Sequence, residues 1–352
     1  MRCCINCFTD SYIRKTIENH GNKGNCDFCA SKNEFVIDIT DVHNPLSEKM
    51  CGLIQVYAVS GLPNARPLKE SLRDDWNIFS GGSEAIQNLI VALCASELGA
   101  NNEIFFKNVA IPNLYDEDFI CNNAVTGGLT WSEFSKSIKY ENRFHNRKFN
   151  ADVFASFLSS VVKTHRSGES FYRARIAENI NGHSCDNMGA PPPKNRSAGR
   201  VNPEGIGVLY LSQEKETVLN EIRANVFDYV TIGTFRAKRD LRVVNLSGLL
   251  KISPFDNIDT IECFALNREI FCELSKEIAK PLRRSDSTLE YLPTQYISEF
   301  VKSQGYDGVE FDSTLRKGGH NLALFDLDAA ECFEVNTFEI NGIDYLFNKT
   351  II

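Results

Sequence analysis

The chain has 352 residues, of which 43% are hydrophobic and 24% charged, ordinary values for a globular protein of about two domains. Its 38 lysines and arginines against 46 aspartates and glutamates give a formal net charge of −8, which disfavours broad electrostatic capture of nucleic acid. No apolar run is long enough to cross a bilayer, and the first residues lack a signal-peptide pattern, so we expect a cytoplasmic protein without membrane contacts.

Two cysteine pairs stand near the start of the chain, Cys4 with Cys7 and Cys26 with Cys29. Their spacing, C-x2-C-x18-C-x2-C, lies in the usual range of zinc sites. Four thiolates complete a tetrahedral set and leave no open position, so we predict a structural Zn²⁺ rather than a catalytic one. The alternative is four reduced structural cysteines, and Cys3 is a second choice of register for Cys4.

We expect three domains: a zinc-binding module at 1–45, a mainly helical regulatory or interaction domain at 46–167, and a β-rich domain at 168–352. Within the first module, the pattern predicts a short helix at 10–18 and a strand at 35–42.

Apolar side chains recur at helical spacing over residues 83–98, which predicts a helix with Ser83 as its cap and Gly99 as its stop. A second helix is predicted at 153–162. Lone histidines such as His165 are expected to be exposed, and this segment shows no catalytic constellation.

The third domain begins with a predicted strand at 170–177, whose alternation places Phe171, Arg173 and Arg175 on one face. A loop rich in Gly, Asn and Pro follows at 179–199. Long loops inside compact domains need a reason, so we weigh a ligand lid against a variable surface loop.

The central stretch of the chain runs from residue 200 to residue 223. It predicts a turn in which Gly205 takes a positive φ, then a strand at 206–212 and a helix at 215–223. Glu221 falls at the edge of the apolar face of this helix, where a buried carboxylate needs a partner or a ligand. A cationic turn beside an acidic helix suits a ligand that carries both phosphate and sugar hydroxyls.

The remaining pattern predicts mixed α/β structure with a β-rich core. The expected elements are strands at 229–235, 241–246, 306–311 and 322–325, helices at 256–279 and 294–304, a turn at 312–321, and a hairpin turn at 341–342.

Several motifs in this half resemble the RES domain family: FYRAR at 171–175, MGAPPP at 188–193, RVNPEG at 200–205, LYLS at 209–212, ETVLNEIR at 216–223 and GYDGVEFDSTLRKGGHNLALFD at 305–326. The resemblance covers about half of the chain. The cysteine module and helical segment are similar to the accessory region that precedes some longer RES domains.

The resemblance implies an α/β (α+β) chain whose catalytic domain has an ADP-ribosyltransferase-like fold, binds NAD⁺ and breaks its nicotinamide–ribose bond by phosphorolysis or hydrolysis. It also implies the catalytic residues Arg173, Glu221 and Ser313, with Thr314 as a neighbouring alternative to Ser313. NAD⁺ is then a substrate rather than a redox cofactor, and the chain has no G-x-G-x-x-G fingerprint.

The same resemblance implies substrate-binding positions at Arg200, Asn202 and Tyr210. Cleavage of the bond builds positive charge on the ribose, which a carboxylate at Glu221 stabilises. Arg173 and Arg200 suit the pyrophosphate as bidentate donors, and Tyr210 can stack on or orient the nicotinamide ribose.

Our leading hypothesis is an NAD⁺ glycohydrolase or phosphorylase that acts as a toxin or defence effector. The N-terminal half then binds an inhibitory antitoxin or an activating partner. Two alternatives remain: ADP-ribosyl transfer to a macromolecule, and a zinc-module binding protein with an inactive RES domain. The sequence leaves open the acceptor, the trigger and self-association.

Overall fold

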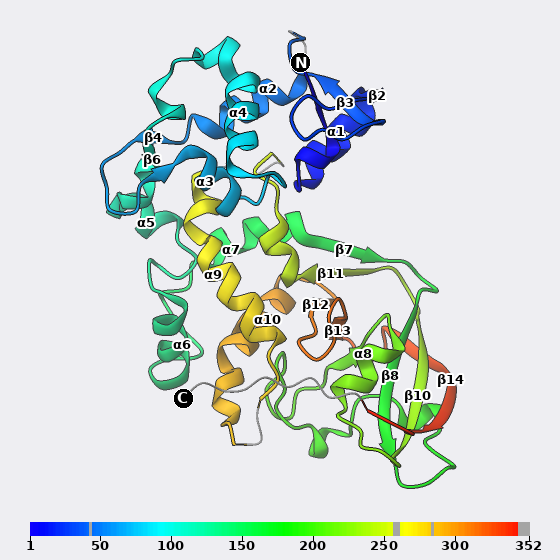
Figure 1. The fold of residues 1–352 in the computed structure, drawn as a ribbon. Helices are drawn as coiled ribbons and strands as arrows, with labels where there is room; N and C mark the ends of the chain where they lie inside the picture. The colour runs from blue at the N-terminus through cyan, green and yellow to red at the C-terminus, as the bar shows by residue number, and fades with distance from the viewer. Residues whose placement is uncertain (42–43, 256–260, 283–284, 344–352) are drawn as a thin grey trace. The chain divides into compact units, whose positions relative to one another are not determined.

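The computed structural model describes residues 1–41, 44–255, 261–282 and 285–343 (Figure 1). The chain packs into two compact units: unit 1 contains Met1–Gly128 and Lys251–Arg268, and unit 2 contains Leu129–Leu250 and Glu269–Ile352. These boundaries differ from the three predicted domains, whose limits stay a prediction. Both helices and sheets are present, which confirms the predicted mixed α/β class. Within the described ranges, no helix is long and apolar enough to span a membrane.

Unit 1 begins with a small antiparallel sheet in the order β1-β3-β2. Its elements are β1 (Arg2–Cys4), η1 (Ile5–Cys7), α1 (Ser11–His20), β2 (Asn22–Gly24) and β3 (Glu34–Asp38). Helix α1 starts at Asp10, whose Oδ1 accepts a hydrogen bond from the Ile13 amide at 2.9 Å. The predicted helix and strand are both confirmed, with ends shifted by a few residues.

The rest of unit 1 is mainly helical, with one short sheet in the order β4-β6-β5. Its elements are α2 (Pro45–Ile54), β4 (Ala58–Val59), β5 (Arg66–Pro67), α3 (Leu68–Asp74), α4 (Ser83–Leu98), η2 (Glu103–Phe105), β6 (Asn108–Ala110), η3 (Pro112–Tyr115) and α5 (Glu117–Asn123). The bounds of α4 are those predicted, and Gly99 ends it with φ +79°. The cap was wrong: the N-cap is Gly82, and Ser83 is the first helical residue.

Unit 2 carries a group of helices built on aromatic contacts. Its helical elements are α6 (Trp131–Tyr140), α7 (Ala151–Leu158), η4 (Ser159–Val161), η7 (Leu246–Lys251), the C-terminal part of α9 (Ile261–Ala279), η8 (Thr288–Tyr291) and α10 (Leu292–Ser303). Phe149 packs edge-on against Tyr296 and Phe300 of α10, with ring centroids 5.3 and 5.1 Å away. The first residues of the helix predicted at 256–279 lie outside the described residues.

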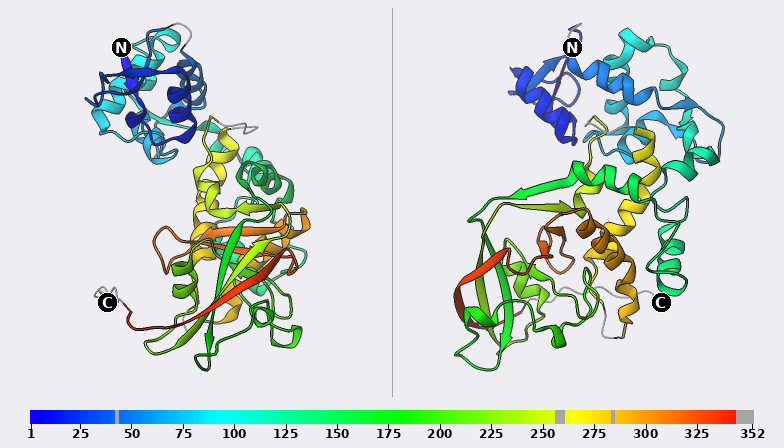
Figure 2. Two further views of the ribbon diagram at one scale, coloured as in Figure 1. Left: turned by 90° about the vertical axis from the view of Figure 1, so that its right-hand side faces the viewer. Right: turned by 180° about the vertical axis from the view of Figure 1, so that it is seen from behind.

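Two sheets form the other half of unit 2 (Figures 1 and 2). The five-stranded sheet has the order β7-β11-β12-β13-β9, and only β11 and β12 run parallel. Its strands are β7 (Val162–His165), β9 (Leu209–Leu211), β11 (Leu241–Asn245), β12 (Gly308–Asp312) and β13 (His320–Leu324). Helix α8 (Lys215–Glu221) follows β9. The helix predicted at 153–162 ends at Leu158, because Val162 already belongs to β7 and pairs with β11.

The second sheet is antiparallel, in the order β14-β10-β8. Its strands are β8 (Ser170–Ala177), β10 (Tyr229–Ala237) and β14 (Ala330–Glu339), which Figure 2 shows side by side. Strand β14 ends just before Asn341-Gly342, where the predicted hairpin turn requires a strand, but its bounds were not predicted. Tyr172 and Ser212 exchange backbone hydrogen bonds of 2.7 and 2.9 Å, which tie this sheet to β9. This bridge fixes Arg173 on β8 beside the segment that leads into α8.

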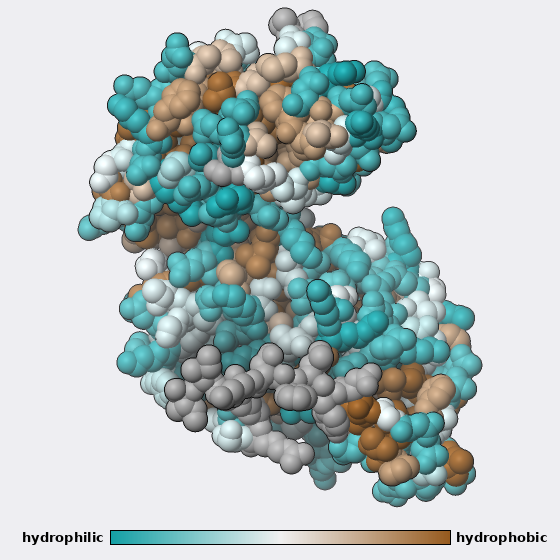
Figure 3. All heavy atoms as spheres, in the orientation of Figure 1, coloured by the Kyte–Doolittle hydropathy of each residue, from teal (hydrophilic) through white to brown (hydrophobic). Residues whose placement is uncertain are grey.

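The outer part of this sheet leaves apolar side chains exposed, including Ile176 on β8 and Phe333 and Phe338 on β14. The space-filling view shows apolar surface in the same region of unit 2 (Figure 3). The residues after Asn341-Gly342 that would complete the predicted hairpin lie outside the described part of the chain.

The loop predicted at 179–199 is present, with short turns η5 (Cys185–Asn187) and η6 (Pro193–Asn195). Its middle is anchored, because Met188 is fully buried in the core of unit 2. A Cβ on Gly233 would lie 3.1 Å from Cγ of Met188, so β10 keeps a glycine where this side chain enters. The end of the loop continues into the segment that carries Arg200.

Candidate functional site

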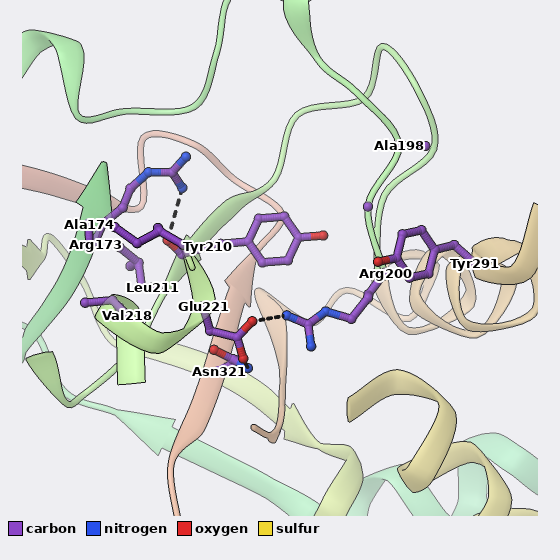
Figure 4. A pocket seen from close by; sticks show the side chains of 12 residues that line it. Arg173, Ala174, Ala198, Arg200, Tyr210, Leu211, Val218, Glu221, Tyr291 and Asn321 are labelled. Carbon is purple, nitrogen blue, oxygen red and sulfur yellow. Dashed lines mark hydrogen bonds and ion pairs between the residues drawn. The ribbon is translucent and has the colours of Figure 1, made fainter. Parts of the chain in front are cut away.

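A cavity of about 290 Å³ lies in unit 2 where β8, β9, β13, α8 and η8 meet the end of the loop. Figure 4 shows its side chains from close by. The residues that line it are Arg173, Ala174, Ala198, Gly199, Arg200, Tyr210, Leu211, Val218, Glu221, Ile222, Tyr291 and Asn321. Four of the six residues predicted to be catalytic or substrate-binding are therefore in one cavity.

Glu221 is the last residue of α8, and its side chain is 16% exposed. Oε1 accepts hydrogen bonds from Ser313 Oγ and from Asn321 Nδ2, each at 2.8 Å. Oε2 accepts a hydrogen bond from Arg200 Nη2 at 2.6 Å, which is also an ion pair. Three donors therefore hold the carboxylate group in one orientation.

Arg200 is the cationic partner of this carboxylate. Its side chain is 11% exposed, Nη1 donates to the carbonyl of Ala279 at 2.9 Å, and the guanidinium lies over the Phe311 ring. Arg200 is predicted to bind the pyrophosphate, and that role stays a prediction; in the structure its guanidinium is paired with Glu221. Both groups have lost most of their hydration. The stability of the ion pair therefore depends on the short contact between them and on the further hydrogen bonds of each partner.

Arg173 is the second arginine of the cavity and has no such partner. Nη1 donates to the carbonyl of Tyr210 at 3.0 Å, and its buried Nε has no hydrogen-bond partner. No carboxylate among the described residues forms an ion pair with it. Burial, with a smaller effect of nearby Arg175, lowers the pKa of Arg173 to about 10, so it stays protonated at neutral pH. A half-buried cation without a carboxylate is suited to an anionic ligand.

Tyr210 lines the cavity, and Asn202 lies behind it as its hydrogen-bond partner. The Tyr210 hydroxyl donates to Asn202 Oδ1 at 2.8 Å, and burial raises the pKa of Tyr210 to about 12. Asn202 Nδ2 lies 3.1 Å from each of the carbonyls of Ser197, Pro203 and Ile206. Asn202 therefore closes the turn and orients Tyr210, and it does not line the cavity. Gly205 in this turn has φ +83°, as predicted.

The close approach of Gly199 to this pair explains its lack of a side chain. A Cβ on Gly199 would lie 2.6 Å from the Tyr210 hydroxyl. Any larger residue would displace either the tyrosine or the segment that carries Arg200.

Ser313 and Thr314 point to different partners, which separates the two alternatives of the sequence analysis. Ser313 Oγ faces Glu221, whereas Thr314 Oγ1 donates to the carbonyl of Ala279 at 3.2 Å. The amide of Ser313 donates to the carbonyl of Gly319 at 2.8 Å, which closes the predicted turn around it. The geometry therefore places Ser313, rather than Thr314, at the carboxylate.

Sequence reasoning missed two residues of the cavity, Asn321 and Tyr291. Asn321 lies inside the last motif that carried the resemblance, and its place after Gly318-Gly319 was the available signal. Tyr291 ends η8, and its hydroxyl accepts a hydrogen bond from the Leu282 amide at 3.1 Å. Nothing in the pattern around Tyr291 indicates a site.

The four predicted cysteine ligands lie together in unit 1, with all four Sγ atoms within 4.8 Å of one another. Cys4 Sγ is 3.3 Å from Cys29 Sγ, and Cys7 Sγ is 3.5 Å from Cys26 Sγ. Backbone amides of Phe28 and Cys29 also point at Cys26 Sγ, as in turns that stabilise a thiolate. Cys3 is buried but outside this cluster, so the chosen register was correct. The donor set fits a tetrahedral, sulfur-ligated metal such as Zn²⁺.

His165 corrects a prediction, because it is 1% exposed rather than on the surface. Its Nδ1 lies 2.8 Å from Glu169 Oε1, and its Nε2 lies 3.2 Å from Glu310 Oε2. Lys163 Nζ donates to both oxygens of Glu310 at 3.1 Å, and Gln213 Nε2 donates to Glu169 at 2.6 Å. We call these five residues the histidine network. The pattern hid it because Glu310, on β12, is 145 residues from His165 on β7.

The pKa values of the network are coupled through its hydrogen bonds. Burial lowers the pKa of His165, but the bonds to Glu310 and Glu169 outweigh it and raise the value. Burial raises the pKa of Glu310 and of Glu169, but His165 and the other donors outweigh it and lower both. The histidine therefore stabilises the fold at low pH and loses that effect as pH rises through its folded pKa. The carboxylates stabilise at higher pH and lose it as pH falls.

The RES domain family matches residues 170–346. The chain belongs to this family. The predicted resemblance is thus confirmed, and the family is consistent with an ADP-ribosyltransferase-like fold for the β-rich part of the chain. No curated protein matches the chain.

A crystal structure of the M. tuberculosis MbcT–MbcA toxin–antitoxin complex contains a chain that is similar to this one. The two are 12% identical, the match covers 52% of this chain and 92% of the other, and the TM-score is 0.30.

Proposed function

We propose that this chain is an NAD⁺-degrading enzyme that cleaves the nicotinamide–ribose bond by hydrolysis or phosphorolysis. One observation carries the proposal: a carboxylate fixed by three donors faces the same cavity as a half-buried arginine that has no carboxylate partner. A cationic ribose and an anionic pyrophosphate are complementary to these two groups. Membership in the RES domain family supports the same chemistry.

Glu221 is the group that stabilises the ribose as the bond breaks. A carboxylate has about four acceptor sites, and the hydrogen bonds from Ser313, Asn321 and Arg200 use three of them. The fourth remains for a ribose hydroxyl. Because the carboxylate is already oriented, it meets the developing oxocarbenium charge without reorganising. Its role is electrostatic. Nicotinamide leaves as a neutral molecule with the electron pair of the broken bond and needs no proton, whereas an attacking water forms the new bond to the ribose and loses a proton to solvent.

Arg173 is the group that holds the pyrophosphate. Its guanidinium is charged and half-buried, its Nε is buried without a partner, and Nη1 donates to the carbonyl of Tyr210. The cavity volume of about 290 Å³ is at the lower limit for a small-molecule site. It suits the nicotinamide ribose, with the adenosine end outside. Tyr210 and Tyr291 supply aromatic surface beside Arg200 (Figure 4).

We assign a structural Zn²⁺ to Cys4, Cys7, Cys26 and Cys29, where four thiolates fix the turns of unit 1. At the level of the organism we infer a toxin or defence effector that depletes NAD⁺, controlled by an antitoxin or another partner through the N-terminal half. This inference comes from the family rather than from a surface of the molecule.

The test is purified full-length protein with NAD⁺, with and without inorganic phosphate, followed by mass spectrometry. Nicotinamide with ADP-ribose indicates hydrolysis, and ADP-ribose-1″-phosphate indicates phosphorolysis. Arg173→Gln should raise the KM for NAD⁺, whereas Arg236→Gln, at an exposed arginine of β10, should not. A wild-type protein that releases no nicotinamide contradicts the proposal, and label transferred from NAD⁺ to a protein supports the transferase alternative.

A further inference from the structure

Helix α10 buries two polar side chains in its first turn. Thr294 is 2% exposed and Gln295 is 3% exposed. Both are uncharged, and both reach the backbone of residues 199–202. Burying an amide is unfavourable unless it is hydrogen-bonded, so the partners of Gln295 show what it does.

Gln295 Nε2 donates both of its protons to this segment. It lies 2.8 Å from the carbonyl of Gly199 and 3.0 Å from the carbonyl of Asn202. Thr294 Oγ1 lies 2.7 Å from the carbonyl of Arg200 and 3.0 Å from that of Tyr291, so its single proton is shared between them. Three carbonyls of a four-residue segment are thus held by adjacent residues of one helix.

Other contacts of this segment come from its own side chains and from Tyr210: Asn202 bonds neighbouring carbonyls, Arg200 bonds Glu221, and the Val201 amide donates to the Tyr210 hydroxyl at 3.3 Å. The segment is neither helix nor strand, and its backbone bonds are the Gly199 amide to the Asn202 carbonyl at 2.9 Å and, further on, the Gly205 amide to the Arg196 carbonyl at 3.0 Å. A loop of this kind relies on side chains for its shape. The buried amide of Gln295 supplies that shape directly.

The same segment places two parts of the cavity wall. Gly199 lies against the Tyr210 hydroxyl, and Arg200 extends to Glu221 (Figure 4). A shift of the Arg200 backbone moves the guanidinium, and the guanidinium is one of three donors that orient the carboxylate. The hydrogen bonds of Gln295 therefore act on Glu221 through two intermediate groups.

We propose that Gln295, assisted by Thr294, is a positioning residue that fixes the 199–202 segment and thereby the Arg200–Glu221 pair. The inference rests on the proposed NAD⁺ reaction, because it assigns Gln295 a part in that site. Gln295 touches neither the cavity nor the substrate, so its effect is on the geometry of the carboxylate rather than on binding. Small displacements of a catalytic group reduce turnover strongly.

The test compares Gln295→Met with Ser298→Ala. Methionine keeps the length and burial of the side chain and removes both donors. Ser298 is equally buried on α10, but its Oγ donates back to the Thr294 carbonyl at 2.8 Å and does not reach the loop. We expect Gln295→Met to lower kcat for nicotinamide release about tenfold to a hundredfold with a smaller change in KM. Ser298→Ala should stay close to wild type.

Two substitutions of Thr294 test whether its hydroxyl is needed. Thr294→Val removes the hydroxyl and should lower kcat, whereas Thr294→Ser keeps it and should restore most of the activity. If Gln295→Met and Ser298→Ala have the same kcat at matched thermal unfolding midpoints, the positioning role is wrong.

A second measurement does not depend on turnover. Hydrogen exchange at the amides of Gly199 and Gly205 should speed up in Gln295→Met and stay unchanged in Ser298→Ala. If wild-type protein releases no nicotinamide, the proposed reaction fails, and the exchange still decides whether Gln295 holds the segment. Unchanged protection in Gln295→Met overturns the inference whatever the reaction is.

Discussion

Replacing Glu221 by glutamine removes the negative charge of the cavity and keeps its shape. A unit positive charge on the ribose about 4 Å from a carboxylate gains about 4 kcal/mol at an effective dielectric constant of 20. Arg200, paired with the same carboxylate at 2.6 Å, offsets part of this gain. Loss of one preorganised electrostatic group elsewhere reduces kcat about 100- to 1,000-fold, and we expect Glu221→Gln to fall in that range.

The same change has a separate effect on stability. Arg200 is 11% exposed and would lose its counter-ion, and breaking a buried pair at one partner costs about 3–5 kcal/mol. Arg200 keeps the carbonyl of Ala279 and the Phe311 ring, so we expect the lower end of that range. Thermal unfolding of the variant measures this term independently of activity.

The assay is nicotinamide release at saturating NAD⁺, below the unfolding temperature of the variant. Glu216→Gln is the matched control, because Glu216 lies on the same helix with a side chain that is 66% exposed. If Glu221→Gln turns over NAD⁺ as fast as Glu216→Gln while both remain folded, Glu221 has no part in the chemistry and the assignment is wrong.

Three further changes test other parts of the chain. Ser313→Ala should lower kcat about tenfold, as expected when a hydrogen bond to a charged group is lost, whereas Thr314→Val should leave it near wild type; equal losses would refute the choice of Ser313. Replacing Cys7 and Cys26 together by serine should remove about one zinc per chain by elemental analysis and lower the unfolding temperature of unit 1; full zinc retention would exclude the site. His165→Gln should destabilise the protein at neutral and lower pH, and the difference from wild type should shrink as pH rises through the raised pKa of His165; a difference that grows with pH would reverse the sign argued for the network.

Local patterns predicted the parts of the fold whose cause is local. Helix α4 has its predicted bounds because its apolar residues keep a helical period and Gly99 can take φ +79°. Strand β8 has its predicted bounds because its alternation is regular and turns flank it. Its Arg173 and Arg175 share a face by that alternation alone.

Elements that form only by pairing with residues far away in the sequence were harder to predict. Strand β14 exists because it pairs with β10 over its whole length, and its own sequence, AECFEVNTFE, is polar and partly exposed. The pattern of such an edge strand is weak, since only one side of it is paired. His165 was wrongly predicted to be exposed for the same reason. Glu310, whose carboxylate contacts its buried ring, is 145 residues away in the sequence.

The candidate site was predicted by motif order, and its contacts were not. Arg200 and Glu221 are 21 residues apart, and each looked like a group that needs an external partner. In the structure the two side chains form an ion pair with each other, so each has a partner before a ligand binds. An arginine already bound to a carboxylate is a weaker candidate for the pyrophosphate. Arg173, with a buried Nε that has no partner, becomes the stronger one.

The pairing also fixes where Glu221 can act. Its two oxygens accept from three donors, one of them cationic, so the carboxylate is oriented before a substrate binds. A carboxylate preorganised in this way is a good partner for a developing positive charge. The rate of the proposed reaction should therefore depend on how precisely the carboxylate is held. Arg200 helps to orient the carboxylate, and Thr294 and Gln295 at the start of α10 hold the backbone that carries Arg200.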